Sequence, residues 1–418
     1  MRKSNSASWL PFLLFGVLLV VGIGLTIFNY RFAVQNPGGN DFLARWMGAR
    51  FWLKEGISPY DEQVSLATQQ MIYGHPADPA QGEDINHFVY PLYSMLFFAP
   101  FGLFDFPVAR ALWMTGLEIS TVLLVFVSLQ LVGWRTSIFK TVALVLFAML
   151  WYHGVRTLIL GQFAGINALL IALALLFIQQ KQDVPAGILL ALSTSKPQMA
   201  VLLVPFTLLW AFSNDRRGII GGLLITLGVL MLASFALVPD WFIAMIRQIT
   251  EYPSYTAYTN IDSPLSYLAD LMPGIRSTLN SLLHVLAGLY LLIEWGLAWR
   301  KDQRHFLWTA AMTMVVTNLI AYRTATTNYM MLLPVLFLIF RVWEYRWKGL
   351  GVGAVWFNLL LFLIGLWALF LVTVQGNQEA PIMFIPLPFF CLIGLWWVRW
   401  WAMRPDRLLF DELAARLG

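Results

Sequence analysis

The sequence predicts an all-α polytopic membrane protein, a bundle of about twelve transmembrane helices with two large exoplasmic loops. Of the 418 residues, 59% are hydrophobic and only 12% are charged. A soluble chain of this size could not cover its surface with so few charges. Apolar runs close to the roughly 20 residues that cross a bilayer recur along the chain. We therefore expect one membrane domain over residues 1–418.

The first apolar run extends from Trp9 to Tyr30 and follows Arg2 and Lys3. It resembles a signal peptide, but it is too long for the apolar core of one, and no small-residue cleavage site follows it. We interpret it as a retained first helix. The other expected spans are 107–132, 138–155, 161–179, 184–195, 198–213, 217–238, 279–299, 306–322, 328–343, 350–373 and 382–402. An even number of spans places both termini on the same side.

Residues 88–104 are also apolar, but the segment is short and is interrupted by Pro91 and Pro100. We interpret it as an interfacial or re-entrant helix. If it were a full span, the sidedness of several later loops would change.

Most of the 27 Lys and Arg residues fall on short loops and tails that share one side when both termini are cytoplasmic. The net charge of +5 therefore reflects membrane topology, and no nucleic-acid partner is expected. The same orientation gives two large exoplasmic loops, 31–106 and 239–278. Loops held by a rigid helix bundle are common places for sites, so we expect the functional site on the exoplasmic face.

Asp41 is the first candidate functional residue. Phe42, Trp46 and Phe51 recur after it at helical spacing, so 41–54 is expected to be an amphipathic helix lying on the membrane. A carboxylate near a helix N-terminus is favoured by the helix dipole. Asp is also a common N-cap, so a capping role and a catalytic role both stay open.

Lys196 is the second candidate, because Ser195-Lys196-Pro197 interrupts an apolar stretch. A lysine in such a segment is costly and suggests function, with a phosphate as its natural partner. The alternative is a side chain that reaches to the lipid headgroups. Arg156 and Arg323 are expected at outer helix ends, where each could anchor to headgroups. Together with Lys196 they would attract an anionic ligand such as a lipid phosphate.

Other chemistry finds little support in the sequence. The five histidines show no metal-ligand spacing, and the single cysteine, Cys391, excludes an internal disulfide. The chain has no P-loop, GxGxxG or GxSxG motif, so soluble nucleotide chemistry and cofactors are not expected. A divalent metal stays open, although no convincing ligand set is present. Glu118, in the middle of a span, is expected to pair with a polar group of a neighbouring helix rather than to relay protons.

Several short motifs follow one another in a characteristic order. Asn40-Asp41 stands near the start of the first exoplasmic loop, followed by Gly56-x-x-Pro59-Tyr60, Tyr90-Pro91-Leu92, Gly161-Gln162 with Asn167, and Ser195-Lys196-Pro197-Gln198. Over roughly residues 9–345 this order resembles glycosyltransferase family 87, multi-spanning transferases of the GT-C type that use polyprenyl-phosphate-linked sugars.

The chain departs from the family pattern at three places. The family commonly shows Tyr-Pro-Pro where this chain has Tyr90-Pro91-Leu92, and its Gly-Gln-x-Asn is stretched here between Gly161 and Asn167. A histidine often found in the late outer loop is replaced by Asn328 or Tyr329. These differences concern the acceptor and the sugar more than the fold.

The resemblance implies a GT-C bundle that moves a sugar, mannose in the best-known members, from a polyprenyl-phosphate donor to a hydroxyl of a glycolipid or glycan. It implies Asp41 as general base and Lys196, Arg323 and Arg156 as ligands of the donor phosphate. The residues expected to contact sugar or acceptor are Gln162, Asn167, Tyr60, His87, Tyr90 and Asn328. The expected location is the plasma membrane of a bacterium or archaeon, with the site exoplasmic.

Two other classes of function stay open at this point. A transporter or flippase of lipid-linked sugars would be expected to show inverted repeats and polar residues deep in several helices. Here no repeat is apparent, and the polar groups gather at the outer ends of the expected spans. A membrane scaffold, or a relative that has lost activity, is the remaining alternative.

Overall fold

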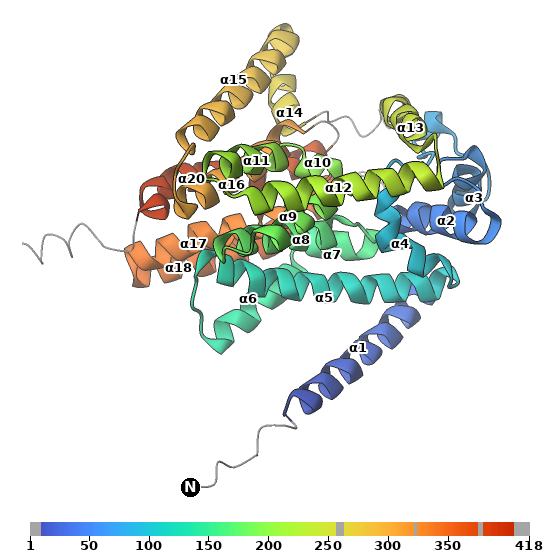
Figure 1. The fold of residues 1–418 in the computed structure, drawn as a ribbon, viewed down its shortest axis with the longest axis horizontal. Coiled ribbons are helices and arrows are strands. Elements are labelled where there is room, and N and C mark those ends of the chain that lie inside the picture. Colours follow the sequence, from blue (N-terminus) through green and yellow to red (C-terminus); the bar gives the residue numbers. More distant parts are fainter. Residues whose placement is uncertain (1–9, 256–262, 322–323, 375–378, 405–418) are drawn as a thin grey trace, which may run out of the picture.

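The structure is a computed structural model that describes residues 10–255, 263–321, 324–374 and 379–404 (Figure 1). All regular elements in these ranges are helices, which confirms the predicted all-α class. The elements up to the middle of the chain are α1 (Leu10–Gln35), α2 (Asn40–Glu55), α3 (Glu62–Tyr73), η1 (Pro79–Gln81), η2 (Leu92–Ser94), α4 (Met95–Gly102), α5 (Phe106–Val132), α6 (Ile138–Leu150), α7 (Tyr152–Leu160), α8 (Ala164–Gln179), α9 (Asp183–Ser193), α10 (Pro197–Ala200) and α11 (Leu203–Ser213).

The second half of the chain is also helical. Its elements are α12 (Arg217–Leu237), α13 (Trp241–Tyr255), α14 (Pro264–Asp270), η4 (Pro273–Ile275), α15 (Arg276–Leu297), α16 (Gln303–Ile320), η5 (Thr326–Leu332), α17 (Leu333–Trp347), α18 (Gly349–Leu360), a π-helical turn η6 (Leu361–Gly365), α19 (Leu366–Thr373), η7 (Pro381–Phe384) and α20 (Pro386–Met403).

Seven segments of the described chain are long and apolar enough to cross a membrane, so the protein is a multi-pass membrane protein. They are Gly16–Gln35, Phe106–Val132, Arg217–Leu237, Pro273–Leu297, Thr326–Trp347, Gly349–Thr373 and Pro381–Met403. The bent pair α6 and α7, which meet at 54°, would make an eighth.

The expected count of twelve spans is not confirmed. Three predicted spans correspond to short helices, and a fourth, 306–322, corresponds to α16, which is not among the candidate segments. The segments predicted at 161–179, 184–195 and 198–213 form α8, of 16 residues, and α9 and α11, of 11 residues each. An 11-residue helix rises about 17 Å, well short of the roughly 30 Å of bilayer hydrocarbon. The apolar pattern alone could not reveal where these helices end.

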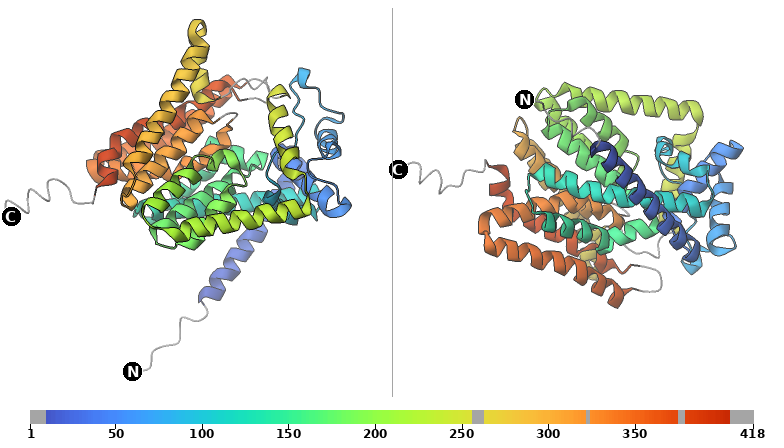
Figure 2. Two further views of the ribbon diagram at one scale, coloured as in Figure 1. Left: turned by 45° about the horizontal axis from the view of Figure 1, so that its top comes forward. Right: turned by 90° about the horizontal axis from the view of Figure 1, so that it is seen from below.

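The main apolar core lies where α5, α8, α9, α16, α17 and α20 pack together (Figure 2). α1 packs along α5 and projects away from the rest of the bundle (Figure 1). At this contact the Asn29 side chain donates hydrogen bonds to Glu118 at 3.0 Å and to Thr115 at 3.1 Å. The expectation that Glu118 pairs with a neighbouring helix is therefore confirmed.

A second apolar cluster covers the N-terminal end of α5 and is built from α2, α3, α4 and α13. These elements belong to the segments predicted as the large loops 31–106 and 239–278, so both segments are largely helical where they are described. The stretch expected as a re-entrant helix at 88–104 forms the short apolar helix Leu92–Gly102, which is too short to span.

Two expectations about α2 need correction. The helix predicted at 41–54 exists, but all its residues from Phe42 to Ala49 are buried, so it is packed inside the protein rather than lying on the membrane. The N-cap is Gly39, with a left-handed φ of 77°, and no side chain caps the helix. Asp41 is the second residue of the helix, so its carboxylate is left for other contacts.

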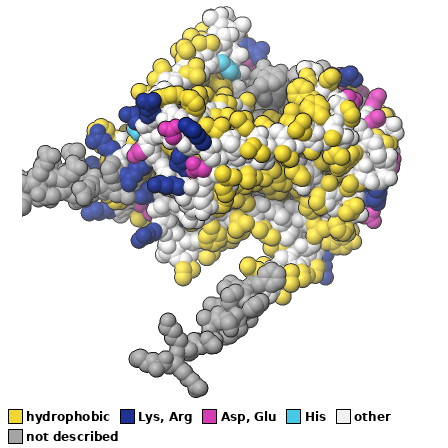
Figure 3. All heavy atoms as spheres, in the orientation of Figure 1, with side chains coloured by type: hydrophobic (Ala, Val, Ile, Leu, Met, Phe, Trp, Pro, Cys, Tyr) yellow, Lys and Arg dark blue, Asp and Glu magenta, His cyan; other side chains and the backbone are white. Residues whose placement is uncertain are grey.

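Charged side chains concentrate at the two ends of the bundle. Figure 3 shows a broad apolar belt between them, with Lys and Arg side chains gathered at the end where α17 and α20 finish. The opposite end, around α2 and α3, carries acidic and basic side chains. This distribution is the one expected of a membrane-embedded bundle.

Candidate functional site

Lys196 lies at a break between two helices near the α2 end of the bundle. Pro197 starts α10, and the residue before a proline is disfavoured in helical conformation, so the chain turns at Lys196 with φ −122° and ψ 82°. The side chain is only 1% exposed. Its Nζ donates hydrogen bonds to Gln162 Oε1 at 2.6 Å and to the Tyr90 hydroxyl at 3.2 Å.

No carboxylate of the described chain lies within 4.0 Å of this ammonium group. Burying a charge without a counter-ion costs several kcal/mol, and neutral oxygens offset only part of that cost. The ammonium group also has three N–H donors, and its two contacts use two of them. Lys196 is therefore suited to hold an anion.

Gln162 reaches Lys196 from the turn between α7 and α8. The turn begins at Gly161, whose φ of 68° ends α7 in a left-handed cap. Asn167 follows in the first turns of α8 and is fully buried. Its amide nitrogen lies 3.7 Å from Met199 Sδ, while its Oδ1 has no hydrogen-bond partner in the part of the chain that is described.

Asp41 is joined to the Lys196 site through Arg45. The Arg45 guanidinium donates to the Asp41 carbonyl at 2.9 Å and lies 4.0 Å from its carboxylate. The guanidinium carbon is also 4.5 Å from the centroid of the Tyr90 ring. Cation–π contacts of this kind stabilise by about 0.5–2 kcal/mol. Tyr90 thus contacts Arg45 through its ring and Lys196 through its hydroxyl.

The Asp41 side chain is 32% exposed, whereas Lys196 is almost fully buried. A carboxylate accessible to water is therefore connected to the buried Lys196 through Arg45 and Tyr90. A proton acceptor placed near sites for negative charge is an arrangement that acid–base catalysis can use.

α2, the helix that carries Asp41, is held close to the turn at Gly161 through stacked aromatic rings. Phe42 stacks on Trp113 of α5 with centroids 4.9 Å apart and an interplanar angle of 11°. The Trp113 indole N–H donates to the Gly161 carbonyl at 2.8 Å. The position of Asp41 is therefore coupled to that of Gln162.

The irregular segment before Tyr90 is supported from α13. Tyr60 donates its hydroxyl proton to the Tyr90 carbonyl at 2.5 Å, and burial raises the pKa of this phenol far above its ordinary value. Gln248 of α13 donates to the Tyr60 carbonyl at 3.1 Å and accepts from Val89 N at 3.2 Å. Val89 has a φ of 46°, a conformation that costs a β-branched residue about 1–3 kcal/mol.

His87 lies on the side of this segment that faces α3 and α13. Its Nδ1 is 2.6 Å from the Ser65 hydroxyl, and its Nε2 is 3.9 Å from the Glu251 carboxylate. Burial lowers the pKa of His87, against the raising effect of Glu251 and Glu62. The neutral imidazole is therefore the favoured form.

Asp84 is a second acidic residue near Asp41. Burial raises its pKa and the charge of Asp41 raises it further, while the Asn86 backbone N–H, at 2.7 Å, and the Arg45 cation lower it. The two carboxylates and Arg45 thus form one interacting group.

Arg156, another predicted phosphate ligand, has different partners from Lys196. Arg156 Nε lies 3.2 Å from the Glu379 carboxylate, to which Tyr152 also donates at 2.6 Å. Arg323 lies outside the described residues. The structure thus gives Arg156 an acidic partner of its own and does not pair it with Lys196.

Asn328, expected to contact the sugar or acceptor, is buried in η5. Its amide nitrogen donates to Thr324 at 3.3 Å, and its Oδ1 has no hydrogen-bond partner among the described residues. With Asn167 it provides two buried amide oxygens that are available for donors such as sugar hydroxyls.

Three residues of this region were not singled out from the sequence: Arg45, Asp84 and Glu379. Arg45 carried a usable signal, because it stands four residues after Asp41 and therefore on the same face of the helix. Glu379 carried none, because it meets Arg156 across more than half the chain. Within the described residues no group of three or more His, Cys, Asp or Glu side chains is placed to hold a metal ion.

Comparison with known proteins gives one match. The model of glycosyltransferase family 87 matches residues 88–321, which include Tyr90, Gln162, Asn167 and Lys196 but not Asp41. No curated protein and no solved structure matches the chain.

Proposed function

The chain belongs to glycosyltransferase family 87, and on this basis we propose that it transfers a sugar from a polyprenyl-phosphate donor to an acceptor hydroxyl. Membership makes the protein a membrane glycosyltransferase. The donor class, the sugar and the roles of individual residues are our proposal. The observation that carries it is the contact series from the Asp41 carboxylate through Arg45 and Tyr90 to the buried Lys196.

In the proposed reaction Asp41 takes the proton from the acceptor hydroxyl. The acceptor oxygen forms a bond to the anomeric carbon of the sugar, and the bond from that carbon to the phosphate oxygen breaks. A single displacement of this kind inverts the anomeric configuration and needs only one carboxylate as base. A positioned base contributes about 10²–10⁴-fold to such a rate.

The leaving polyprenyl phosphate gains negative charge as the bond breaks. Lys196 would stabilise this charge from a buried position, where electrostatic effects are strongest. Arg45 adds a second cation, in contact with the Tyr90 ring. We include Arg156 and Arg323 as further phosphate ligands, although Arg156 would first have to exchange its contact with Glu379.

The sugar and acceptor would lie between these groups. Gln162, Asn167 and Asn328 offer amide groups to sugar hydroxyls, and mannose is the sugar that the family resemblance favours. His87 and Tyr90 belong to the adjoining segment, and Tyr60 acts through its support of Tyr90. The acceptor is a glycolipid or glycan hydroxyl, reached on the exoplasmic face.

The test is transfer from purified polyprenyl-phosphate mannose by the full-length protein in nanodiscs, with Asp41→Asn compared with Asp105→Asn. Asp105 is a highly exposed acid of the same region, so its variant should keep normal transfer. We expect Asp41→Asn to lose transfer by about 10²–10⁴-fold at an unchanged melting temperature. Full transfer activity of Asp41→Asn would refute the proposed role of Asp41 as general base. Translocation of the donor lipid without any transfer would support a flippase instead.

A further inference from the structure

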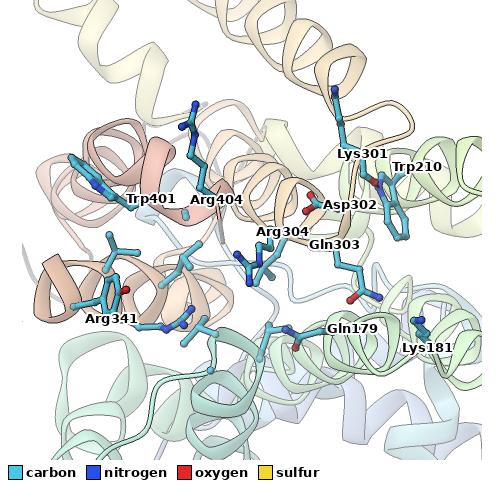
Figure 4. A pocket seen from close by; sticks show the side chains of 18 of the residues that line it. Gln179, Lys181, Trp210, Lys301, Asp302, Gln303, Arg304, Arg341, Trp401 and Arg404 are labelled. Atoms are coloured by element: carbon cyan, nitrogen blue, oxygen red, sulfur yellow. The ribbon is translucent and has the colours of Figure 1, made fainter. Parts of the chain in front are cut away.

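At the end of the bundle opposite Asp41 and Lys196, the structure holds a cavity of about 590 Å³ (Figure 4). It is surrounded by the C-terminal ends of α5, α8, α11 and α17, the N-terminal end of α16 and the end of α20. α5 alone separates the two regions by about 40 Å, at 1.5 Å per residue. This cavity therefore takes no part in the proposed transfer.

The cavity wall carries a large excess of positive charge. Among the described residues that line it, Asp302 is the one acidic residue, and the cations are Lys181, Arg216, Lys301, Arg304, Arg341 and Arg404. Asp302 is occupied as the cap of α16, where it accepts from the His305 backbone at 3.1 Å. Of the cations, Arg216 is neutralised by Asp183, with nitrogen–oxygen distances of 2.8 and 2.9 Å.

The side chains of Arg304 and Lys181 have no hydrogen-bond or ion-pair partner in the described part of the chain. In Figure 4 the Arg304 and Arg341 side chains extend toward the middle of the cavity, beside Gln179 and Gln303. Lys181, Lys301 and Arg404 stand near its edge. Leu307 and Leu338 supply an apolar part of the wall.

We propose that this cavity binds a phosphate-bearing anion, with Arg304 and Lys181 as its principal ligands. The volume falls in the range of roughly 300–1,000 Å³ typical of small-molecule sites. Guanidinium groups suit phosphate oxygens because they donate in a planar fork. The general excess of Lys and Arg on one side of a membrane protein is an alternative explanation for these cations. That excess would place cations near the lipid surface, but it would not by itself arrange them around a concave site.

Two sources of phosphate fit the chemistry: an anionic phospholipid headgroup, with its glycerol against the apolar wall, and a soluble phosphate. The experiment uses full-length protein purified in detergent and stripped of lipid. One arm adds short-chain phosphatidylglycerol, with phosphatidylcholine as the neutral comparison. The other arm adds inorganic pyrophosphate at constant ionic strength. Native mass spectrometry and thermal shift report binding in both arms.

We expect at least one phosphate source to bind and to raise the melting temperature. Arg304→Gln and Lys181→Gln should each weaken that binding by about tenfold, the loss expected for a charged hydrogen bond. Arg135→Gln is the matched control, because Arg135 is an exposed cation at the same end that does not line the cavity. Arg304 is also exposed, so its removal should leave the ligand-free melting temperature unchanged.

Preferential binding of phosphatidylglycerol identifies a lipid site, and binding of pyrophosphate alone identifies a soluble ligand. The proposal is overturned if neither phosphate source binds above its control, or if Arg304→Gln and Arg135→Gln bind equally well. Because the variants lie far from Asp41, this outcome is separate from the success or failure of the transferase proposal.

Discussion

Phe42 packs against Gly161 so closely that the glycine has no space for a side chain. A Cβ atom added at Gly161 would lie 2.6 Å from the Phe42 Cβ, and the glycine φ of 68° is itself unfavourable for other residues. One glycine therefore sets how near α2, with Asp41, approaches the turn that carries Gln162. The two halves of the proposed site depend on this contact.

We predict that Gly161→Ala reduces transfer at least tenfold and destabilises the protein. The added methyl group must move either α2 or the turn, and overpacking of this kind costs about 1–3 kcal/mol. Thermal unfolding and transfer kinetics measure the two effects. Gly116→Ala is the control, because a Cβ at Gly116 of α5 meets no atom within 4 Å. Wild-type activity of Gly161→Ala would show that the α2 contact does not position the site.

Neutralising Lys196 should reduce transfer without reducing the stability of the fold. Lys196→Gln keeps an N–H donor in the region of Gln162 but removes the buried charge. We expect transfer to fall by about 10²–10³-fold, the usual loss when one preorganised donor to developing negative charge is removed. The melting temperature should be unchanged or higher, since a buried ammonium without a carboxylate is costly.

Both the transfer rate and the melting temperature are to be measured for Lys196→Gln and for the wild type. Lys54→Gln, a change at an exposed lysine of α2, supplies the baseline for both. A large drop in melting temperature with normal transfer would mean that Lys196 serves packing rather than catalysis.

Tyr90 should contribute through both its ring and its hydroxyl. Tyr90→Phe keeps the ring beneath Arg45 and removes only the hydroxyl that contacts Lys196. We expect it to lower kcat/KM by about tenfold or more, the effect of one hydrogen bond to a charged group. Tyr90→Leu also removes the cation–π contact, so its loss should be larger. Equal kinetics of the two variants would contradict a role for the Arg45–Tyr90 contact.

The sequence predicted the helical membrane fold and several individual contacts well. The interrupted segment at Lys196, the helix after Asn40 and the pairing of Glu118 all follow from local patterns that tertiary structure preserves. The number of spans did not follow, because α9 and α11 are as apolar as true spans but only 11 residues long. Hydropathy reports apolar surroundings, and a protein core provides them as well as lipid does.

In the candidate site, too, local sequence patterns predicted some contacts and not others. Lys196, Gln162 and Tyr90 were each chosen from the sequence, and the structure brings them into hydrogen-bond contact. The pairing of Arg156 with Glu379 joins residues that are distant in the chain, and no local pattern encodes it. Likewise, Asp41 was expected to cap its helix as readily as to act in catalysis. Only the backbone of Gly39 shows that the cap lies two residues earlier.

Folding stability should depend on pH through His87. Burial lowers the pKa of this histidine in the folded protein below its ordinary value of 6.5. As pH falls through 6.5, the unfolded chain therefore takes up a proton that the folded protein does not, and folding stability declines. Above 6.5 both states are neutral and the contribution is constant. The melting temperature of His87→Asn should consequently fall less between pH 7.5 and pH 5.5 than that of the wild type. An equal or larger acid-induced loss in His87→Asn would show that Glu251 and Glu62 outweigh burial and keep the imidazole protonated.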